Sequence, residues 1–541
     1  MQPYLNLARL LETVSREKSR QASAGLVSSF LKDLPPHLVC PLVRLLVGEL
    51  WPSWELREMG VGPISILKVL ESICGPPVHH LSREFPDLGL LAEACLKQKQ
   101  QNPLAREPLE ALDVYQGLHK LSLQSGEHSR YRKEAILRGL LLEAAPLEGR
   151  YIVRTALRSM QAGLGPRLMA EALAGAFSAT PDRIWDAYSR MPEMGMVAQA
   201  ASQGALDEVK IVPGRPVKPM LFPLGDGPVE TESAACLVRC RGLRAQVHVS
   251  QGRFWVFTSR LRDITPALAP LSGALLGLDH ELIMDGELIG FKGKRLLSPS
   301  EMVRYINRKH LSRRSSVQPR LAIGDLLFQD GLDLTNRDYQ DRRALLGGLF
   351  PAVASPEGLP SDDDPQVAIV RQVELPGQQP LQRRGFQIVV RSLRSPYLPG
   401  RMSRRDIILR GQRLEVRAAV IEARRGSGAR REDFVSYRVA LREGDHLVPV
   451  GWVSVEQNDQ KALLDDRILK LAATEKGQRA FLPPPGPDGK FPVMEIHLDG
   501  LRREGKASLI RPRVVQIILE GSAAEVDALE KILGDAEPPC S

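Results

Sequence analysis

The N-terminal part of the chain carries apolar residues at helical spacing. Segments 135–145 and 150–160 repeat apolar residues every three to four positions, which is the period of an amphipathic helix. Proline and glycine interrupt the pattern at short intervals, for example at Pro35-Pro36 and Ser125-Gly126. The pattern predicts a helical domain over residues 1–208, in which segment 168–180 forms a closely packed helix.

The pattern changes at a proline-rich segment over residues 211–223. Four prolines make this segment a poor helix, and we interpret it as a domain linker. The next part mixes strand-like segments with two helical ones, and Ser250-Gln251-Gly252 predicts a hairpin turn. An α+β domain is therefore predicted over residues 209–411. Its expected strands are 234–240, 244–250, 253–259, 282–291 and 321–328, and its expected helices are 301–311 and 337–350.

The last part of the chain is rich in strand-like segments and suits a small β-barrel over residues 412–541. A polar, acidic loop at 355–365 is expected to be exposed, and the C-terminus is predicted to be a short helix with a frayed tail. The fold class is thus multidomain α+β, which fits 541 residues because single cores rarely exceed roughly 250–300 residues. The expected strands of the barrel are 414–423, 434–443, 448–455 and 493–500.

Composition excludes several classes of protein. No apolar run approaches the ~18–20 residues that cross a bilayer, and the N-terminus lacks a signal-peptide core. We therefore expect a cytoplasmic protein without membrane contact. The six cysteines are scattered with no Cys-x-x-Cys pair, so we expect neither a disulfide framework nor a zinc site. Cys236 and Cys240 are interpreted as ordinary buried thiols.

The positive charge is concentrated in the middle of the chain. The net charge is +9, and residues 210–410 hold thirty lysine and arginine residues against twenty acidic ones. Eight arginines lie between Arg383 and Arg410, with Asp406 as the one acid. A charge run is usually a solvated face, but guanidinium groups suit phosphate well, so this density favours a nucleic-acid partner.

Several stretches carry recognisable motifs in a fixed order along the chain. The first motif is Arg154 followed by Gly163-Leu-Gly165. The others lie after residue 208. They are VRCRGLRAQVHV (238–249), MDGELIGF (284–291), GDLLFQDGLDL (324–334), QIVVRSLRSPYLPGR (387–401), AVIEARRGSGARR (419–431) and LIRPRVVQI (509–517). The ordered set resembles the ATP-dependent DNA ligase family of the archaeal and eukaryal type over nearly the whole chain. The resemblance implies a DNA-binding domain at 1–208, a nucleotidyltransferase (adenylation) domain at 209–411 and an OB-fold at 412–541. It also implies ATP and Mg²⁺ as cofactors.

The first nucleotidyltransferase motif departs from the family at its reactive residue. The family uses a lysine to attack the α-phosphate of ATP, and Arg239 occupies that position here. A guanidinium stays protonated and its lone pairs are delocalised, so Arg239 cannot act as that nucleophile. We therefore expect no catalytic residue in this chain. Further departures from the family pattern fall at Leu237, Arg241, Gly324, Phe386, Gln387, Arg391, Ile408 and Arg410.

Other positions of the motifs survive, including Asp285 and Gly286. By the resemblance, the positions that correspond to the family's nucleotide pocket are Gly242, Arg244, Arg260, Glu287, Arg391 and Arg410. Glu287 is the one candidate metal ligand, although a single carboxylate makes a poor Mg²⁺ site. It could equally be a strand-end acid paired with a nearby arginine.

We expect contacts with DNA to be made mainly to the phosphate backbone. The candidate residues are Arg130, Arg132, Lys133, Arg154, Arg401, Arg404, Arg405, Arg424, Arg425, Arg430 and Arg431. The main hypothesis is a ligase-like protein that binds nicked or duplex DNA and cannot form lysine–AMP. Two alternatives remain. The first is an active ligase in replication, repair or recombination, or one that seals nicks that are already adenylated. The second is a non-catalytic scaffold with a replication or repair protein as its partner. An RNA-capping type enzyme is disfavoured, because that family lacks the long helical domain.

Overall fold

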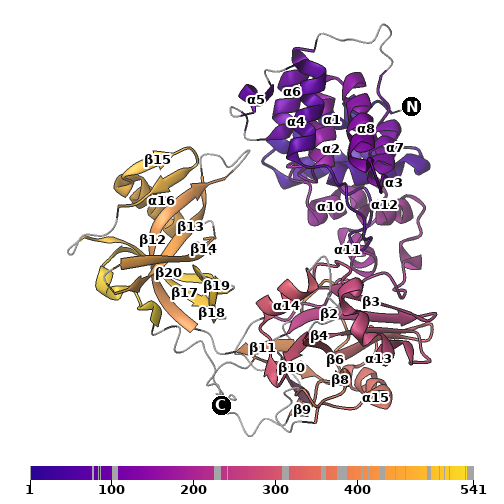
Figure 1. Ribbon diagram of the computed structural model, residues 1–541, viewed down its shortest axis with the longest axis vertical. Coiled ribbons are helices and arrows are strands. Elements are labelled where there is room, and N and C mark those ends of the chain that lie inside the picture. Colours follow the sequence, from indigo (N-terminus) through magenta and orange to yellow (C-terminus); the bar gives the residue numbers. More distant parts are fainter. Residues whose placement is uncertain are drawn as a thin grey trace.

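The structure is a computed structural model of residues 1–541. It describes residues 2–75, 78–82, 85, 87–99, 108–223, 233–240, 242–307, 316–354, 361–373, 387–403, 407–411, 414–426, 433–444, 446–456, 459–483, 489–498, 500–504, 506–510, 512–530 and 532. Helices, a mixed α+β part and a strand-rich part follow one another along the chain as three lobes (Figure 1). No helix among the described residues is both long and apolar enough to cross a membrane.

The N-terminal part is helical, as predicted. One core of buried side chains runs from Tyr4 to Leu206 and is built from the inward faces of amphipathic helices. Its elements are α1 (Tyr4–Arg16), α2 (Arg20–Lys32), α3 (Pro36–Val47), α4 (Pro63–Cys74), α5 (Val78–Leu81), α6 (Leu88–Lys97), α7 (Ala111–Ser122), α8 (Ser129–Glu143), α9 (Pro146–Ala156), α10 (Pro166–Ala176), α11 (Pro181–Arg190), α12 (Met194–Ser202) and the 3-10 helix η1 (Leu206–Glu208).

The middle part contains two sheets with helices against one of them, which confirms the predicted α+β domain class. The strands are β1 (Ala234–Val238), β2 (Leu243–Ser250), β3 (Arg253–Thr258), β4 (Leu282–Lys292), β5 (Arg295–Leu296), β6 (Val317–Gln329), β7 (Leu332–Asp333), β8 (Val367–Ile369), β9 (Gln372–Val373), β10 (Gln387–Ser392) and β11 (Ile407–Gly411). The helices are η2 (Thr265–Leu271), α13 (Ser272–Leu276), α14 (Pro299–Ile306) and α15 (Tyr339–Leu349).

One sheet has the order β3-β2-β4-β6-β7, with β5 on β4 and β8 on β6, and the other has the order β11-β10-β1-β9. The hairpin predicted at residues 250–252 joins β2 to β3, and Gln251 and Gly252 both adopt positive φ angles there. Buried residues of both sheets, including Leu237, Ile289 and Val389, meet in one core between them. The two sheets therefore face each other across a shared interior.

The proline-rich segment 211–223 is part of that interior rather than a free linker. Val217 and Met220 are fully buried, and the Val217 N–H donates to Gln246 Oε1 at 2.7 Å. The Met220 N–H donates to the hydroxyl of Tyr397 at 3.0 Å. Prolines keep the segment extended, and an extended segment can pack along a sheet as well as connect domains, so the interpretation as a linker was incomplete.

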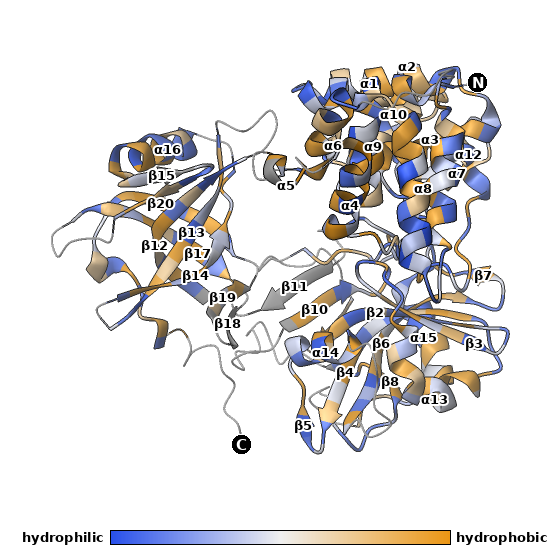
Figure 2. Ribbon diagram, turned by 45° about the horizontal axis from the view of Figure 1, so that its top comes forward, coloured by the Kyte–Doolittle hydropathy of each residue, from blue (hydrophilic) through white to orange (hydrophobic). Residues whose placement is uncertain are grey.

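The C-terminal part is rich in strands around a separate core that includes Val439 and Ile496, as predicted. Its elements are β12 (Leu414–Arg425), β13 (Phe434–Glu443), β14 (His446–Val453), α16 (Asp459–Leu471), β15 (Thr474–Lys476), β16 (Arg479–Phe481), β17 (Phe491–Leu498), β18 (Gly500–Glu504), β19 (Lys506–Ile510), β20 (Arg513–Gly521) and the 3-10 helix η4 (Ala523–Glu525). Each of the three parts has its own core of buried apolar residues, and hydrophobic and hydrophilic positions alternate along their helices and strands (Figure 2).

The acidic loop predicted at 355–365 is only partly described. Residues 355–360 lie outside the described residues. Asp364 is 4% exposed, and its carboxylate accepts the N–H groups of Ala354 and Ser361 at 2.8 and 2.6 Å. At this position the prediction of an exposed loop is wrong, because the carboxylate closes a turn.

Candidate functional site: a pocket between the two sheets

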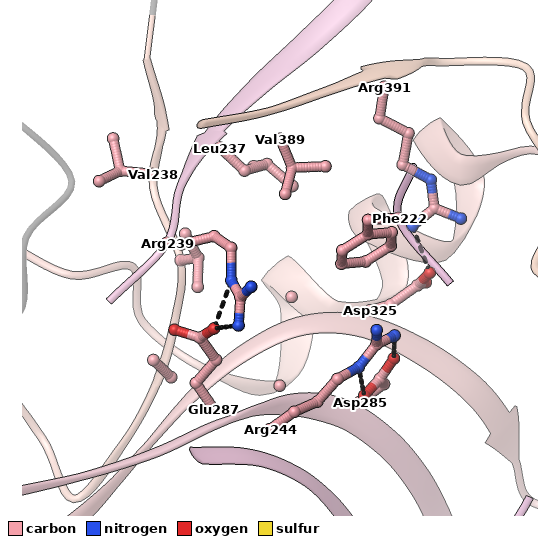
Figure 3. Close-up of a pocket in the computed structure, with 14 residues that line it drawn as sticks. Phe222, Leu237, Val238, Arg239, Arg244, Asp285, Glu287, Asp325, Val389 and Arg391 are labelled. Carbon is pink, nitrogen blue, oxygen red and sulfur yellow. Dashed lines mark hydrogen bonds and ion pairs between the residues drawn. The ribbon is translucent and has the colours of Figure 1, made fainter. Parts of the chain in front are cut away.

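A small pocket opens between the two sheets of the α+β part. It encloses about 70 Å³, whereas small-molecule sites typically measure roughly 300–1,000 Å³. Strands β1 and β10 form one wall, and β2, β4 and β6 form the other (Figure 3). The lining residues are Phe222, Leu237, Val238, Arg239, Arg244, Asp285, Gly286, Glu287, Ala322, Gly324, Asp325, Val370, Val389 and Arg391.

Asp285 and Glu287 reach the same pocket because alternate residues of a strand point to the same face. The pairing of β4 with β6 is irregular between Asp285 and Gly286, because their partners Asp325 and Ile323 leave Gly324 of β6 as an extra, unpaired residue. Gly286 lies so close to β6 that a Cβ would sit 2.3 Å from the carbonyl oxygen of Ala322. The surviving Asp-Gly-Glu motif therefore places two carboxylates of β4 in the pocket, next to the bulge of β6.

Glu287 is held by Arg239, which directly follows β1. Arg239 Nε donates to Glu287 Oε1 at 2.7 Å, and a second guanidinium nitrogen contacts the same oxygen. The N–H of Gly242 donates to the other carboxylate oxygen at 3.4 Å. Glu287 is 8% exposed, so its carboxylate is buried with both oxygens occupied. Figure 3 shows this pair crossing the pocket from one wall to the other.

Asp285 is held in the same manner by Arg244. The guanidinium donates to both carboxylate oxygens, at 3.2 and 2.6 Å, and the hydroxyl of Tyr397 donates to Oδ2 at 2.8 Å. Burial lowers the pKa of Arg244, but the attraction of Asp285 outweighs it and the pKa ends above its ordinary value. The ring of Phe222 covers this guanidinium, with 4.4 Å from its centroid to Arg244 Cζ.

Asp325, in the wall of the pocket, lies between two arginines. Arg342 donates to both of its oxygens at 2.8 and 3.1 Å, and Arg391 donates to Oδ2 at 2.6 Å. Arg342 is fully buried, and Asp325 and Arg391 are each 3% exposed. Burial raises the pKa of Asp325, but Arg391 and Arg342 together outweigh burial and hold that pKa below its usual value. The carboxylate of Asp325 is therefore ionised, and both of its oxygens accept hydrogen bonds from arginine.

The geometry does not fit a metal-dependent nucleotidyl transfer. Mg²⁺ requires carboxylate oxygens free to bind it, together with oxygens from the substrate phosphates. Each pocket carboxylate is instead neutralised by at least one guanidinium at hydrogen-bond distance. Within the described part of the chain, no group of three His, Cys, Asp or Glu residues is placed to hold a metal ion. In this structure Glu287 is paired with Arg239, as its alternative interpretation expected, and the metal role of Glu287 stays a prediction.

Comparison with known proteins explains this arrangement of strands and carboxylates. Residues 3–204 match the model of the DNA ligase N terminus, and residues 229–407 match that of the ATP dependent DNA ligase domain. The chain belongs to the ATP-dependent DNA ligase family. It is 27% identical to the DNA ligase of Methanoculleus marisnigri, with 98% of this chain and 97% of the relative covered. It is 28% identical to the DNA ligase of Methanothrix thermoacetophila, with 98% of each covered.

The solved structure named Pmar-Lig_Pre covers 94% of this chain and 98% of its own, with a TM-score of 0.55 and 13% identity. That likeness concerns the fold alone. Against the ligase family, the pocket contains arginine where the nucleophilic lysine is expected, at Arg239. Gly324 stands where an aromatic residue is expected, and a Cβ there would meet only a carbonyl oxygen 3.7 Å away. Arg241, Phe386 and the side chains of Gln387, Ile408 and Arg410 lie outside the described residues.

The remaining pocket predictions divide in two. Gly242, Arg244, Glu287 and Arg391 come together at the pocket or its edge. Arg260 does not, because it lies exposed in the turn after β3 and is absent from the pocket lining. A nucleotide-pocket position of Arg260 therefore stays a prediction. Sequence reasoning missed Phe222, Asp325 and Arg342; Tyr397 stood inside the recognised Ser-Pro-Tyr-Leu-Pro-Gly stretch and could have been found.

A second, larger cavity of about 1,800 Å³ lies between the helical part and the strand-rich part. From the strand-rich part it is lined by Arg424, Asp433 and Gln478, and from the helical part by residues of α1, α2, α6, α9 and the segment entering α10. We call this cavity the groove. Its exposed cations are Arg16, Lys18, Arg20, Arg167 and Arg424.

Several residues predicted to contact DNA have internal roles instead. Lys133 is 8% exposed and its ammonium donates to the carbonyl of Met59 at 2.8 Å, so the prediction of a DNA contact is wrong for this residue. Arg154 lines the groove but is 7% exposed and binds Asp87 at 2.7 Å. Arg401 pairs with Asp182 and Asp186 on α11. These cations hold the protein together because burial or an acidic neighbour fixes them, which spacing alone does not reveal.

The other predicted DNA contacts are exposed or undescribed. Arg130 and Arg132 are exposed on α8, where Arg130 pairs with Glu134 and Arg132 bonds to Gln124. Arg424 lines the groove, and Arg425 lies over the ring of Phe434 at 4.6 Å. Arg404, Arg405, Arg430 and Arg431 lie outside the described residues.

Proposed function

We propose that this member of the ligase family binds nicked or duplex DNA and does not form the covalent lysine–AMP intermediate. The observation that carries the proposal is Arg239, which stands at the nucleophile position and is bound to Glu287 inside the pocket. A nucleophile needs a free lone pair, and guanidinium offers none near neutral pH. No lysine stands among the described residues that line this pocket.

The neighbouring pairs support the same conclusion. Arg244–Asp285 and Arg391–Asp325 occupy the other two carboxylates. A single change at Arg239 would therefore leave the pocket without a free carboxylate pair, and ATP with Mg²⁺ would still lack its binding partners. In a family whose members use ATP, we propose that this chain makes no productive use of it.

Binding to DNA is supported by the groove rather than by the pocket. Its exposed lysine and arginine side chains project from two domains that face each other across a cavity wide enough to be lined by both. Cations in such a position attract the phosphate backbone, and their contribution falls steeply with salt because binding releases counterions from the DNA. The net charge of +9 acts in the same direction.

The decisive experiment is adenylation. The purified full-length protein is incubated with radiolabelled ATP and Mg²⁺, denatured and examined for a covalent AMP adduct, with the DNA ligase of Methanoculleus marisnigri treated alongside. We expect an adduct on the relative only. Arg239→Lys alone is also expected to form none, because Asp285 and Asp325 stay paired. An adduct on the unmodified chain would overturn the proposal, and one on Arg239→Lys would show that the neighbouring pairs matter little.

Two further assays separate the alternatives. A pre-adenylated nicked duplex tests sealing, which does not chemically require the lysine nucleophile, and we expect no ligated product. A gel-shift titration of nicked and intact duplex across salt concentrations tests binding, and we expect affinity to fall with salt. Salt-independent or absent binding would favour a scaffold role with a replication or repair protein as its partner. We further propose that the strand-rich part is an OB-fold that contributes Arg424 to the groove.

A further inference from the structure

Two cysteines that are distant in the sequence meet inside the helical domain. Cys74 is the last residue of α4, and Cys95 lies on α6, 21 positions later. The two helices pack together and lie side by side in both ribbon views (Figures 1 and 2). The Cys74 thiol contacts the carbonyl oxygen of Cys95 at 3.2 Å and also hydrogen-bonds its thiol. Both cysteines are free in this structure.

The surroundings of the two thiols differ in a way that assigns them different tasks. Cys95 is 1% exposed, whereas Cys74 is partly exposed at the helix end. The hydrogen bond from Cys95 lowers the pKa of Cys74, and Lys99 acts in the same direction against burial. The hydrogen bond with Cys74, followed by burial, raises the pKa of Cys95. An accessible thiol with more thiolate character reacts first, and a protected neighbour resolves the product.

Cys74 stands at the end of α4, directly before a glycine. A disulfide needs an S–S bond of about 2.05 Å and suitably placed Cβ atoms. Cys74 ends its helix, and Gly75 follows with a φ of 85°, a left-handed conformation that glycine adopts without strain. A side chain at a helix end can turn toward its neighbour without breaking an internal turn of the helix. The other described cysteines lie elsewhere in the chain, with Cys40 on α3, Cys236 on β1 and Cys240 shortly after β1.

We propose that Cys74 and Cys95 form a reversible disulfide within the folded protein, by exchange with a small-molecule disulfide. The Cys74 thiolate attacks one sulfur of the small disulfide, forms a mixed disulfide and releases one small thiol. The Cys95 thiol, on losing its proton, then attacks the Cys74 sulfur and releases the second small thiol. The two protein thiols lose two electrons and two protons, and the small disulfide is reduced to two thiols.

The bond would fasten the end of α4 to α6, the helix whose N-terminal cap Asp87 binds Arg154 at the wall of the groove. Closing a loop in this domain restricts its unfolded state, so the oxidised domain is expected to unfold at a higher temperature. The proposal concerns the helical domain alone and stands whether or not the chain adenylates or binds DNA.

The test treats the folded full-length protein with oxidised glutathione, blocks remaining thiols by alkylation, and maps peptides without reduction. We expect a Cys74–Cys95 linked peptide that dithiothreitol removes. Cys95→Ser should trap a glutathione adduct on Cys74, while Cys74→Ser should leave Cys95 unmodified, since Cys95 is buried. Cys40→Ser is the matched control and should still form the link.

Absence of the linked peptide from folded wild-type protein would overturn the proposal. So would a link that appears only in denaturant, or equal glutathione adducts on Cys74 and Cys95 in the two serine variants. Thermal unfolding of the oxidised and reduced forms provides an independent measurement: the oxidised wild type should melt higher, and oxidised Cys74→Ser should not. An unchanged melting temperature in the presence of the linked peptide would contradict the expected restriction of the unfolded state.

Discussion

Arginine has different roles in the pocket and in the groove: it is buried in ion pairs in the first and exposed to solvent in the second. In the pocket, Arg239, Arg244 and Arg391 are largely buried and each binds a carboxylate. In the groove, Arg20 and Arg424 are exposed to solvent, and Arg20 makes only a surface pair with Glu171. Surface ion pairs contribute about 0–1 kcal/mol to stability, so an arginine in such a pair can readily bind a phosphate in place of its carboxylate. An arginine in a buried pair cannot, because breaking that pair leaves a buried charge without a partner. Arginine therefore occupies the carboxylates of the pocket, whereas in the groove its positive charge stays exposed.

This difference shows that phosphate transfer and attraction of DNA place different demands on arginine, lysine and carboxylate side chains in a ligase fold. Phosphate transfer needs a lysine lone pair and free carboxylates, and the pocket keeps the carboxylates only as partners for arginine. Attraction of DNA needs exposed positive charge, which the groove retains on two domains. Under our proposal the chain lacks the first property and keeps the second, and the described linings of the groove and the pocket share no residue.

The largest expected effect is on the pocket's innermost pair. Asp325→Asn removes the charge that compensates both Arg342 and Arg391, which leaves two guanidinium groups buried without a counter-ion. We expect a loss of about 3–5 kcal/mol in the free energy of unfolding, measured by urea denaturation. Asp341→Asn, an exposed acid on neighbouring α15, is the control and should change stability little. Equal effects of the two variants would show that the pocket is not an internally paired network.

The prediction for the groove is smaller and concerns affinity. Replacing Arg20, Arg167 and Arg424 together with glutamine removes three exposed cations from the groove lining. We expect DNA affinity to fall by about 10²-fold at low salt, and the slope of log affinity against log salt to decrease by roughly one for each phosphate that is no longer neutralised. Stability should change little, because none of the three is buried.

Arg295→Gln is the matched control, since Arg295 is an exposed cation on β5 outside the groove lining. If it weakens DNA binding as much per residue as the triple variant does, the attraction arises from overall charge and the groove has no special role. The pocket variant at Asp325, assayed where it remains folded, should bind DNA normally. A parallel loss there would couple the two regions that we describe as separate.

The sequence allowed the fold to be predicted well and the site in part. Hydrophobic spacing predicted helices before residue 208 and strands after it, because each element buries one face against its own core. The pocket position of Arg239, Arg244 and Glu287 followed from the ordered motifs. The partners did not: Asp325–Arg342 joins β6 to α15, and Phe222 enters from a segment that resembles a linker in sequence. Such contacts depend on tertiary packing that no local pattern encodes.

The cysteine and lysine positions teach the same lesson. Cys74 and Cys95 are 21 positions apart and share no motif, yet the packing of α4 on α6 brings their thiols together. Lys133 belongs to a run of basic residues on α8 that suggests a solvent face, but the loop before α4 covers it and its ammonium binds Met59. A run of basic residues predicts a positively charged surface only where no neighbouring element buries their side chains.

The smallest expected effect distinguishes the two regions by their response to pH. His248, on β2, is fully buried and neutral: its Nδ1 accepts the N–H of Gly214 at 3.1 Å, and Nε2 lies 2.9 Å from Gln246 Oε1. Burial lowers the pKa of His248 to about 3. The unfolded chain takes up a proton below a pKa of about 6.5 while the folded chain does not, so stability falls as pH decreases from 6.5 toward 3. We expect a loss of about 1.4 kcal/mol between pH 7.5 and 5.5 from this residue.

The measurement is urea denaturation of the wild type and His248→Gln at both pH values. The variant should start less stable, since it disturbs two buried hydrogen bonds, but should lose less stability on acidification. Over the same interval DNA affinity should stay constant in conditions where both forms are folded, because no histidine is among the described residues that line the groove. An affinity that changes with pH while stability does not would reverse the contrast, placing the titrating group in the groove and not at His248 on β2.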